Sequence, residues 1–333
     1  MKKGRKILII RLDHLGDLIL STPFIKNVKM NEPMSHVACL VKRPYSEILE
    51  GNKYVDEILI YDEKKPGIVL EKIRMKKFDW VIVLSPNFKT YHFAKMTGIE
   101  KRSGYLYSGR VFSKIFTPFY LTDFAVYDIE QKLLKKEKIP HEVEILDDFG
   151  SSLGFSFTDS EIIFSLSREE IESGKKLISY RTNYEDKYYV GVHISNKWIA
   201  PGFDADKFID FLYEVKNRFH DACLILTYGP EETELIEEIK NDEILRESLI
   251  GGLSVREWAS IIRELSVLFT MDTGATHIAA AFKVPTVCFF RDKTFTKCSQ
   301  QWYPWKTRHI NLKHSKIINY ENLDWGEIRA MII

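Results

Sequence analysis

The chain has 333 residues, enough for two domains of ordinary size with a substantial core. It is 45% hydrophobic and 29% charged with a formal net charge of +1, as expected of a water-soluble globular protein. This balance argues against a dedicated nucleic-acid-binding protein, which normally carries a strong basic excess.

In chain order, short runs rich in Ile, Val and Phe alternate with amphipathic stretches, a pattern typical of parallel α/β sheets buried on both faces. In the first half we expect strands at 6–10, 36–41, 57–61 and 79–85, and helices at 18–30 and 88–98. Residues 104–135 are aromatic and look irregular, and 137–163 mix helix with loop.

After a polar helix at 167–180 the alternation resumes. Strands are expected at 188–195, 222–229, 267–272 and 285–290, and helices at 204–219, 230–242, 254–265 and 274–282. We therefore predict an α/β protein with two Rossmann-like parallel-sheet domains, at 1–175 and 185–333, facing a central cleft. The last helix is free to pack back on the N-terminal domain. Ligands should bind beyond the carboxyl ends of the strands.

The cysteines and the apolar runs of the sequence indicate where in the cell the protein is located. The four cysteines form no CxxC pair, which favours buried thiols over disulfides or a zinc site. The apolar run Ile7–Ile10 is too short for a signal peptide, and the stretch 278–290 is interrupted by Lys283 and Pro285. We expect a cytoplasmic protein, with peripheral association at the cytoplasmic face of the inner membrane allowed.

Basic residues gather early in the chain, and they are interpreted either as solvated faces or as a weak basic lip for an acidic substrate. They are Lys42-Arg43, Lys76-Lys77, Lys101-Arg102, Arg110 and Lys114.

The first motif, "RLDHLGDLILSTP" at 11–23, follows the first predicted strand. Gly16 permits a tight turn, and Asp17 falls at the start of the next helix. Asp17, or Asp13, can cap that helix and complement its dipole. Alternatively, Asp17 is a carboxylate held at the mouth of the cleft as a general base. Because an ordinary Asp has a pKa of about 3.9, such a base needs partial desolvation to act near neutrality.

The second motif, "GVHISNKWIAPGF" at 191–203, places Ser195 and Lys197 in a short loop after a strand. A lone lysine in a loop is usually solvated, but this pair also suits an anionic phosphate. The third, "MDTGATHIAAAFKVPT" at 271–286, leads from a strand through Asp272, Thr273 and Gly274 into a helix of small residues. Amides at that helix start form an anion site, whereas His277 is either a core residue or part of the site.

Together these segments resemble glycosyltransferase family 9, the ADP-heptose lipopolysaccharide heptosyltransferases. "IIRLDHLGDLILSTP" is similar to the N-terminal pattern of the family, and "DTGATHIAAAFKVPT" matches each fixed position of its C-terminal signature. "TYGPEETELIEEI" and "GGLSVREWASIIREL" resemble the segments before that signature. Residues 100–165 carry no motif.

The resemblance implies a GT-B fold and an inverting transferase that needs no metal and no cofactor. The donor, most simply ADP-heptose, would bind the C-terminal domain, and a lipopolysaccharide-type glycan acceptor the N-terminal one. Asp17 would be the base, with Gly16, Asp13 and His14 on the acceptor side. Lys197 would assist catalysis by offsetting diphosphate charge. The residues that the resemblance places at the donor are Ser195, Lys197, Gly229, Glu231, Glu232, Leu253, Asp272, Thr273, Gly274 and His277.

Two loops depart from the family pattern. "NKWIAPGF" replaces an Arg or His followed by Trp-Pro after the lysine, and "FFRDKTF" replaces a Phe-Gly-Pro-Thr loop. Arg291 and Lys293 therefore put cations where a glycine turn is expected, which bears on donor and acceptor choice.

Other functions remain open at this stage. A transferase of the same fold could use a UDP or GDP donor, and a catalytically silent nucleotide-binding protein would share the anion site. A NAD-dependent dehydrogenase fits less well, because neither strand-turn-helix carries G-x-G-x-x-G.

Overall fold

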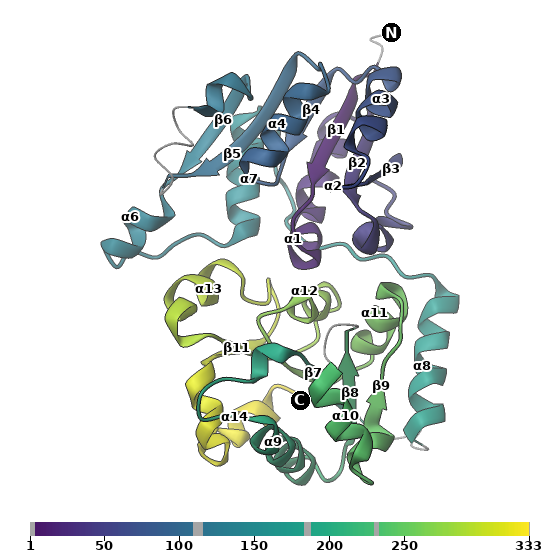
Figure 1. Cartoon of the computed structure of the whole chain (residues 1–333), viewed down its shortest axis with the longest axis vertical. Coiled ribbons are helices and arrows are strands. Elements are labelled where there is room, and N and C mark those ends of the chain that lie inside the picture. Colours follow the sequence, from purple (N-terminus) through teal and green to yellow (C-terminus); the bar gives the residue numbers. More distant parts are fainter. Residues whose placement is uncertain (1–3, 109–115, 183–187, 230–232, 333) are drawn as a thin grey trace. The chain divides into compact units, whose positions relative to one another are not determined.

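The computed structural model describes residues 4–108, 116–182, 188–229 and 233–332. The chain divides into two compact units, Met1–Ser165 (unit 1) and Leu166–Ile333 (unit 2). The boundary falls before the helix α8 (Arg168–Thr182), because α8 packs on α11 (Val255–Arg263) of unit 2. Figure 1 shows one sheet in each unit.

Unit 1 is built on a six-stranded, wholly parallel sheet in the order β3-β2-β1-β4-β5-β6. Its strands are β1 (Lys6–Arg11), β2 (His36–Lys42), β3 (Glu57–Tyr61), β4 (Trp80–Val83), β5 (Lys101–Tyr107) and β6 (Asp123–Tyr127). The apolar run at Ile7–Ile10 is buried on both faces, which explains why this strand lies at the centre of the sheet.

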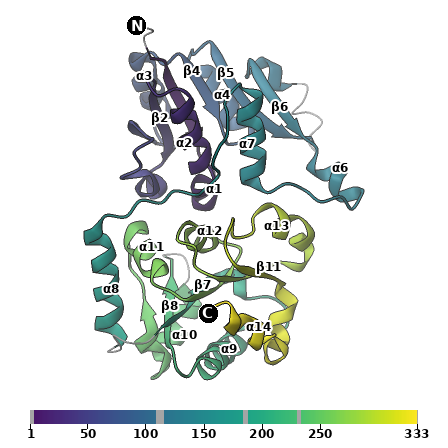
Figure 2. The same ribbon diagram turned by 180° about the vertical axis from the view of Figure 1, so that it is seen from behind.

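Helices cover both faces of this sheet. They are α1 (Leu15–Leu20), α2 (Thr22–Asn31), α3 (Pro66–Lys76), α4 (Phe88–Met96), α6 (Ile129–Leu134) and α7 (Glu142–Ser152), with 3-10 turns η1 (Arg43–Leu49) and η2 (Thr117–Phe119). α3 and α4 pack on one face through Val69, Ile73 and Phe93. α2 and α7 contact each other on the opposite face (Figure 2).

Unit 2 repeats the plan with a parallel sheet in the order β12-β11-β10-β7-β8-β9. Its strands are β7 (Tyr189–Ile194), β8 (Cys223–Tyr228), β9 (Leu249–Ile250), β10 (Val267–Met271), β11 (Thr286–Phe290) and β12 (His309–Lys313). Besides α8 and α11, its helices are α9 (Ala205–Arg218), α10 (Thr233–Asn241), α12 (Gly274–Ala281), α13 (Phe295–Gln301) and α14 (Trp325–Ala330), with turns η3 (Asn196–Trp198), η4 (Leu245–Ser248), η5 (Asp292–Thr294) and η6 (His314–Asn322).

One expectation about these elements is corrected. The segment 104–135 is not merely irregular, since it contributes most of β5 and all of β6. Within unit 2, Trp325 and Ile328 of α14 belong to the core, and Arg329 donates to Arg218 O at 2.8 Å. No helix in the described ranges is both long and apolar enough to span a membrane.

Candidate functional site

The motif loops lie at equivalent places in the two sheets. In unit 1 the strand order reverses between β1 and β4, and in unit 2 it reverses between β7 and β10. Ligands of open α/β sheets bind at such switch points, beyond the carboxyl ends of the two strands. The loop carrying Asp13 and Asp17 follows β1, the loop carrying Ser195 and Lys197 follows β7, and Asp272 follows β10.

In unit 1 the site is organised by Arg11, the last residue of β1, whose side chain is only 2% exposed. Its Nη2 lies 3.2 Å from Asp17 Oδ1 and 3.4 Å from Glu142 Oε1, and its Nε lies 3.6 Å from Asp13 Oδ2. Its Nη1 donates to Leu84 O. Burial alone would lower the pKa of Arg11, but the surrounding oxygen atoms raise it well above its usual value, so the guanidinium stays charged.

Glu142 connects this cluster to two tyrosines of β5. It is the first residue of α7, and it accepts hydrogen bonds from Tyr105 Oη at 2.7 Å and Tyr107 Oη at 2.6 Å. Burial, reinforced by Glu142, raises the pKa of both tyrosines, so they remain neutral donors. These bonds hold Glu142 against Arg11, which in turn fixes the position of Asp17.

Asp17 and Asp13 are similarly exposed but differently placed. Asp17 accepts from the backbone N–H of His14 at 3.2 Å, so helix capping and the ion pair with Arg11 coexist. Asp13 accepts from Asn87 Nδ2 at 3.3 Å and lines a cavity of about 470 Å³ together with His14 and Lys42. Burial, with the nearby Asp17 and Glu142 charges, raises the pKa of Asp13 against the opposing effect of Arg11.

Gly16 does not form the expected tight turn. It is the second residue of α1 and lies outside the left-handed region, so the chain bends between Leu12 and His14 instead. The backbone N–H of Leu12 donates to Ser85 Oγ at 2.7 Å, which ties this bend to the residues that follow β4. Asp17 is nevertheless in the first turn of the helix, as predicted.

In unit 2 the two expected loops contact each other. Lys197 lies in the turn after β7, and its Nζ donates to Asp272 O, directly after β10. The register places His193 beside Thr270, so the chain leaves both strands at the same edge. Ser195, Lys197, Asp272 and Thr273 are therefore brought together at the switch point.

Ser195 carries a buried hydroxyl whose Oγ has no hydrogen-bond partner within the described part of the chain. Behind it, His193 Nδ1 lies 3.1 Å from Thr227 Oγ1, and its ring packs on Trp258 with 4.7 Å between ring centroids. Burial lowers the pKa of His193 to about 4, so the ring is neutral near pH 7.

The start of α12 offers amides to an anion. Thr273 is the N-cap residue, but its side chain does not cap the helix; its Oγ1 lies 3.1 Å from Thr270 Oγ1 instead. The first-turn amides of Gly274 and Ala275 therefore keep their capacity to bind a ligand. His277 is buried within this helix.

The expected nucleotide-side residues are only partly described. Gly229 follows β8, and Leu253 precedes α11; both are half-buried. Close to them in the chain, the Tyr228 ring lies so near the Gly251 backbone that a Cβ at residue 251 would be 2.0 Å from the ring. Glu231 and Glu232 lie outside the described residues, as do Arg110 and Lys114 of the basic segments.

The two departures from the family pattern meet in space. Arg291, after β11, donates from Nη1 to Ile199 O at 3.3 Å, which joins the "FFRDKTF" loop to the "NKWIAPGF" loop. In the same "FFRDKTF" loop, Asp292 Oδ2 accepts a hydrogen bond from Ser315 Oγ at 2.6 Å. The two loops are therefore in contact with each other close to Lys197 in the chain.

Sequence reasoning missed Arg11, Glu142 and the two tyrosines. A charged residue that ends the apolar run "KILIIR" was a signal for Arg11. Glu142 had only a local signal, the capping box between His141 and Glu144 at the start of α7. Within the described chain, no group of three or more His, Cys, Asp or Glu side chains is arranged to hold a metal ion.

The model of glycosyltransferase family 9 (heptosyltransferase) matches residues 69–324. Lipopolysaccharide heptosyltransferase 3 of Escherichia coli K12 is 23% identical over 312 residues, covering 87% of this chain and 82% of the relative.

Two solved structures superpose over 98% of this chain. The first is a glycosyl transferase family 9 protein from Veillonella parvula, with a TM-score of 0.78, 19% identity and 97% of its chain covered. The second is the Escherichia coli ADP-heptose LPS heptosyltransferase II, with a TM-score of 0.77, 15% identity and 98% of its chain covered. With its two parallel-sheet units, the chain has the GT-B fold expected from its sequence.

Proposed function

We propose that this chain, which belongs to glycosyltransferase family 9 and is therefore a glycosyltransferase, transfers heptose from ADP-heptose to a lipopolysaccharide core-type acceptor. The observation that carries the proposal is the placement of both motif loops at the switch points of their sheets. We also propose that the reaction takes place in the cytoplasm, on an acceptor held at the inner membrane.

The proposed step is a single inverting displacement. The acceptor oxygen attacks the anomeric carbon, and its proton passes to the Asp17 carboxylate. The bond between the anomeric carbon and the diphosphate oxygen breaks, and ADP departs with the electron pair. Transfer requires the acceptor hydroxyl held at unit 1 to reach the anomeric carbon held at unit 2.

The donor's diphosphate is assigned to the Lys197 ammonium, the Ser195 hydroxyl and the amides at the start of α12. Positive charge and preformed amides stabilise the negative charge that grows on the leaving diphosphate. The contact of Lys197 with Asp272 O supports this assignment, because it places the cation beside that helix start. No step of the proposal uses a metal ion.

The ion pair with Arg11 gives the Asp17 carboxylate a fixed direction. Asp13, whose pKa burial raises, lies on the same loop and is the alternative base. We assign the base to Asp17 because it occupies the aspartate position of the family pattern, and Asp13 to acceptor binding in its cavity.

Paired substitutions test this division. In Asp17→Asn, turnover should fall by about 10²–10⁴-fold, the usual contribution of a general base, while the Kd for ADP stays unchanged. Asp13→Asn should mainly raise the KM for the acceptor. If Asp17→Asn keeps wild-type turnover and Asp13→Asn loses it, the base has been assigned to the wrong residue.

The nucleotide is tested separately by titration calorimetry with ADP, UDP and GDP. ADP should bind most tightly, and Ser195→Ala should weaken that binding. Tighter binding of UDP or GDP would favour a transferase of the same fold with another donor. Nucleotide binding without consumption of any donor would favour the catalytically silent protein.

A further inference from the structure

The early basic residues do not form one lip. Lys42 and Arg43 lie at the carboxyl end of β2, whereas Lys76, Lys77 and Lys101 lie where β4 and β5 begin, at the opposite edge of the sheet. Strands of this length, at about 3.3 Å per residue, separate the two edges by roughly 20 Å. The second group therefore belongs to another surface, which we call the amino-edge face.

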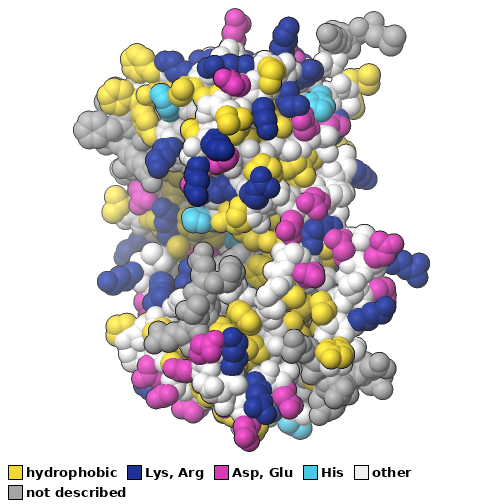
Figure 3. Space-filling model, turned by 45° about the vertical axis from the view of Figure 1, so that its right-hand side comes forward, with side chains coloured by type: hydrophobic (Ala, Val, Ile, Leu, Met, Phe, Trp, Pro, Cys, Tyr) yellow, Lys and Arg dark blue, Asp and Glu magenta, His cyan; other side chains and the backbone are white. Residues whose placement is uncertain are grey.

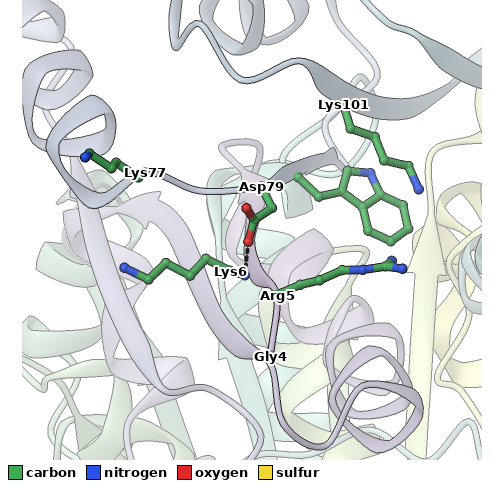
Figure 4. A pocket seen from close by; sticks show the side chains of 7 residues that line it. Gly4, Arg5, Lys6, Lys77, Asp79 and Lys101 are labelled. Atoms are coloured by element: carbon green, nitrogen blue, oxygen red, sulfur yellow. Dashed lines mark hydrogen bonds between the residues drawn. The ribbon is translucent and has the colours of Figure 1, made fainter. Parts of the chain in front are cut away.

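A cavity of about 690 Å³ opens in this face (Figure 4). Arg5, Lys6, Lys77 and Lys101 surround it, and Asp79 is its only acidic lining residue among those described. The Asp79 carboxylate already accepts the backbone N–H of Lys6 at 2.7 Å. The cavity is thus positively charged at an edge of the sheet that the proposed transfer reaction does not use.

Several acidic residues at the amino edge are paired with cations. Glu32 Oε1 lies 3.3 Å from Arg5 Nη1, Glu57 Oε1 lies 2.6 Å from Lys76 Nζ, and Asp56 Oδ2 lies 2.6 Å from Lys29 Nζ. Within the described chain neither Lys77 nor Lys101 forms an ion pair, and Lys101 Nζ stands 3.5 Å from the centroid of the Trp80 ring. These two ammonium groups face the single carboxylate of Asp79, so the lining keeps a positive charge.

Apolar side chains project from the same edge. Met34, Met75 and Met96 are 75%, 74% and 43% exposed, and they lie at or just beyond the C-terminal ends of α2, α3 and α4. Each helix runs back from the carboxyl edge, so these ends meet the amino edge; Arg74 Nη2 donates to Met96 O at 2.6 Å. Figure 3 shows many Lys and Arg side chains over the upper part of unit 1, with apolar groups and some Asp and Glu side chains among them.

We propose that the amino-edge face docks unit 1 onto an anionic phospholipid membrane. Lysines near such a surface are attracted by its negative potential, and exposed apolar side chains gain free energy by entering the interface. The exposed methionines favour a membrane over a nucleic acid, whose phosphates offer nothing apolar to bury. A simpler explanation of the positive charge is that the cations complement the negative C-terminal ends of helices. Arg5 and Lys101 do not fit this explanation, because they lie on or beside strands.

This docking is independent of the proposed transfer reaction, and it leaves the carboxyl edge open. If the proposed function also holds, a membrane-anchored acceptor would need to present its hydroxyl roughly 20 Å from the lipid surface.

Vesicle flotation of the full chain tests the proposal. The wild type should bind phosphatidylcholine vesicles that contain phosphatidylglycerol, should bind pure phosphatidylcholine vesicles weakly, and should dissociate at high salt. The double variant Lys77→Glu/Lys101→Glu should bind at least about 25-fold more weakly, because each cation contributes roughly a factor of five. The matched control is Lys216→Glu/Lys316→Glu, which changes the same charge at exposed lysines of unit 2 and should bind like the wild type.

A second measurement does not depend on charge reversal. In Met75→Trp, the emission of the added tryptophan should shift to the blue with anionic vesicles and be quenched by brominated lipids. Equal vesicle binding by the two double variants, or an unchanged Met75→Trp emission, would overturn the proposal. So would tighter binding of duplex DNA or RNA than of vesicles, which would make the face a nucleic-acid surface.

Discussion

Replacing Arg11 with methionine keeps most of the side-chain length but removes a cation that pairs with Asp13, Asp17 and Glu142. Glu142 is as deeply buried as Arg11, each side chain being 2% exposed. Removing one partner of such a buried pair costs about 3–5 kcal/mol, because the remaining charge is left uncompensated. We therefore expect Arg11→Met to destabilise unit 1 by about 3–5 kcal/mol at pH 7.

Hydrogen exchange measured by mass spectrometry isolates this effect, because it reports the opening of β1 without assuming that the whole chain unfolds in one step. The expected change corresponds to exchange in β1 that is roughly 150- to 5,000-fold faster. The difference from wild type should shrink near pH 4. Burial raises the pKa of Asp13 above its usual value, so in the variant this carboxyl takes up a proton as the pH falls and leaves less charge uncompensated.

Arg102→Met is the matched control, since this guanidinium donates to the carbonyls of Tyr120, Ile99 and Glu100 and its described contacts include no carboxylate. Its cost should not depend on pH. A change of less than 1 kcal/mol in Arg11→Met, or a cost that persists unchanged at pH 4, would refute the idea that Arg11 compensates buried charge.

Further predictions concern unit 2. Ser195→Ala should leave the stability unchanged or slightly raised, because it removes an unpartnered buried hydroxyl, yet it should weaken ADP binding by about 5- to 10-fold in calorimetry. Unchanged ADP affinity would remove Ser195 from the donor site. His193 has a pKa lowered to about 4 by burial, so the stability it contributes is fully present above pH 6.5 and is lost as the pH falls toward 4. The unfolding free energy of unit 2 should then drop by about 3 kcal/mol between pH 7 and pH 4, and His193→Gln should lose most of that dependence; an equal slope in the variant would contradict the assignment.

Local patterns in the sequence were sufficient to predict the central elements. The apolar run before Arg11 predicted β1, and the small residues after Gly274 predicted α12; both elements lie where a buried parallel sheet requires them. The edge strand β6 escaped detection because its residues 123–127 are half-buried or exposed and lack the continuous apolar pattern. Gly16 was expected in a tight turn but lies in the first turn of α1. A glycine can have the same neighbours in sequence in either position.

The buried cluster around Arg11 could not be predicted for a different reason. Tyr105 is 94 residues from Arg11 and Glu142 is 131 residues away, so their contact depends on strand order and on the docking of α7. No spacing in a single sequence reports such a contact. By contrast, the positions of the loops after β7 and β10 could be predicted, because each depends on residues adjacent to one strand.

The central claim is sugar transfer from a nucleotide donor. It is tested most directly by mass spectrometry of the products that the purified protein forms from ADP-heptose and a set of truncated lipopolysaccharide core acceptors. We expect one acceptor to gain the mass of a single heptosyl group, with release of an equal amount of ADP, and Asp17→Asn to form this product about 10²–10⁴-fold more slowly. Unconsumed ADP-heptose with every acceptor, under conditions where the protein binds ADP, would contradict it.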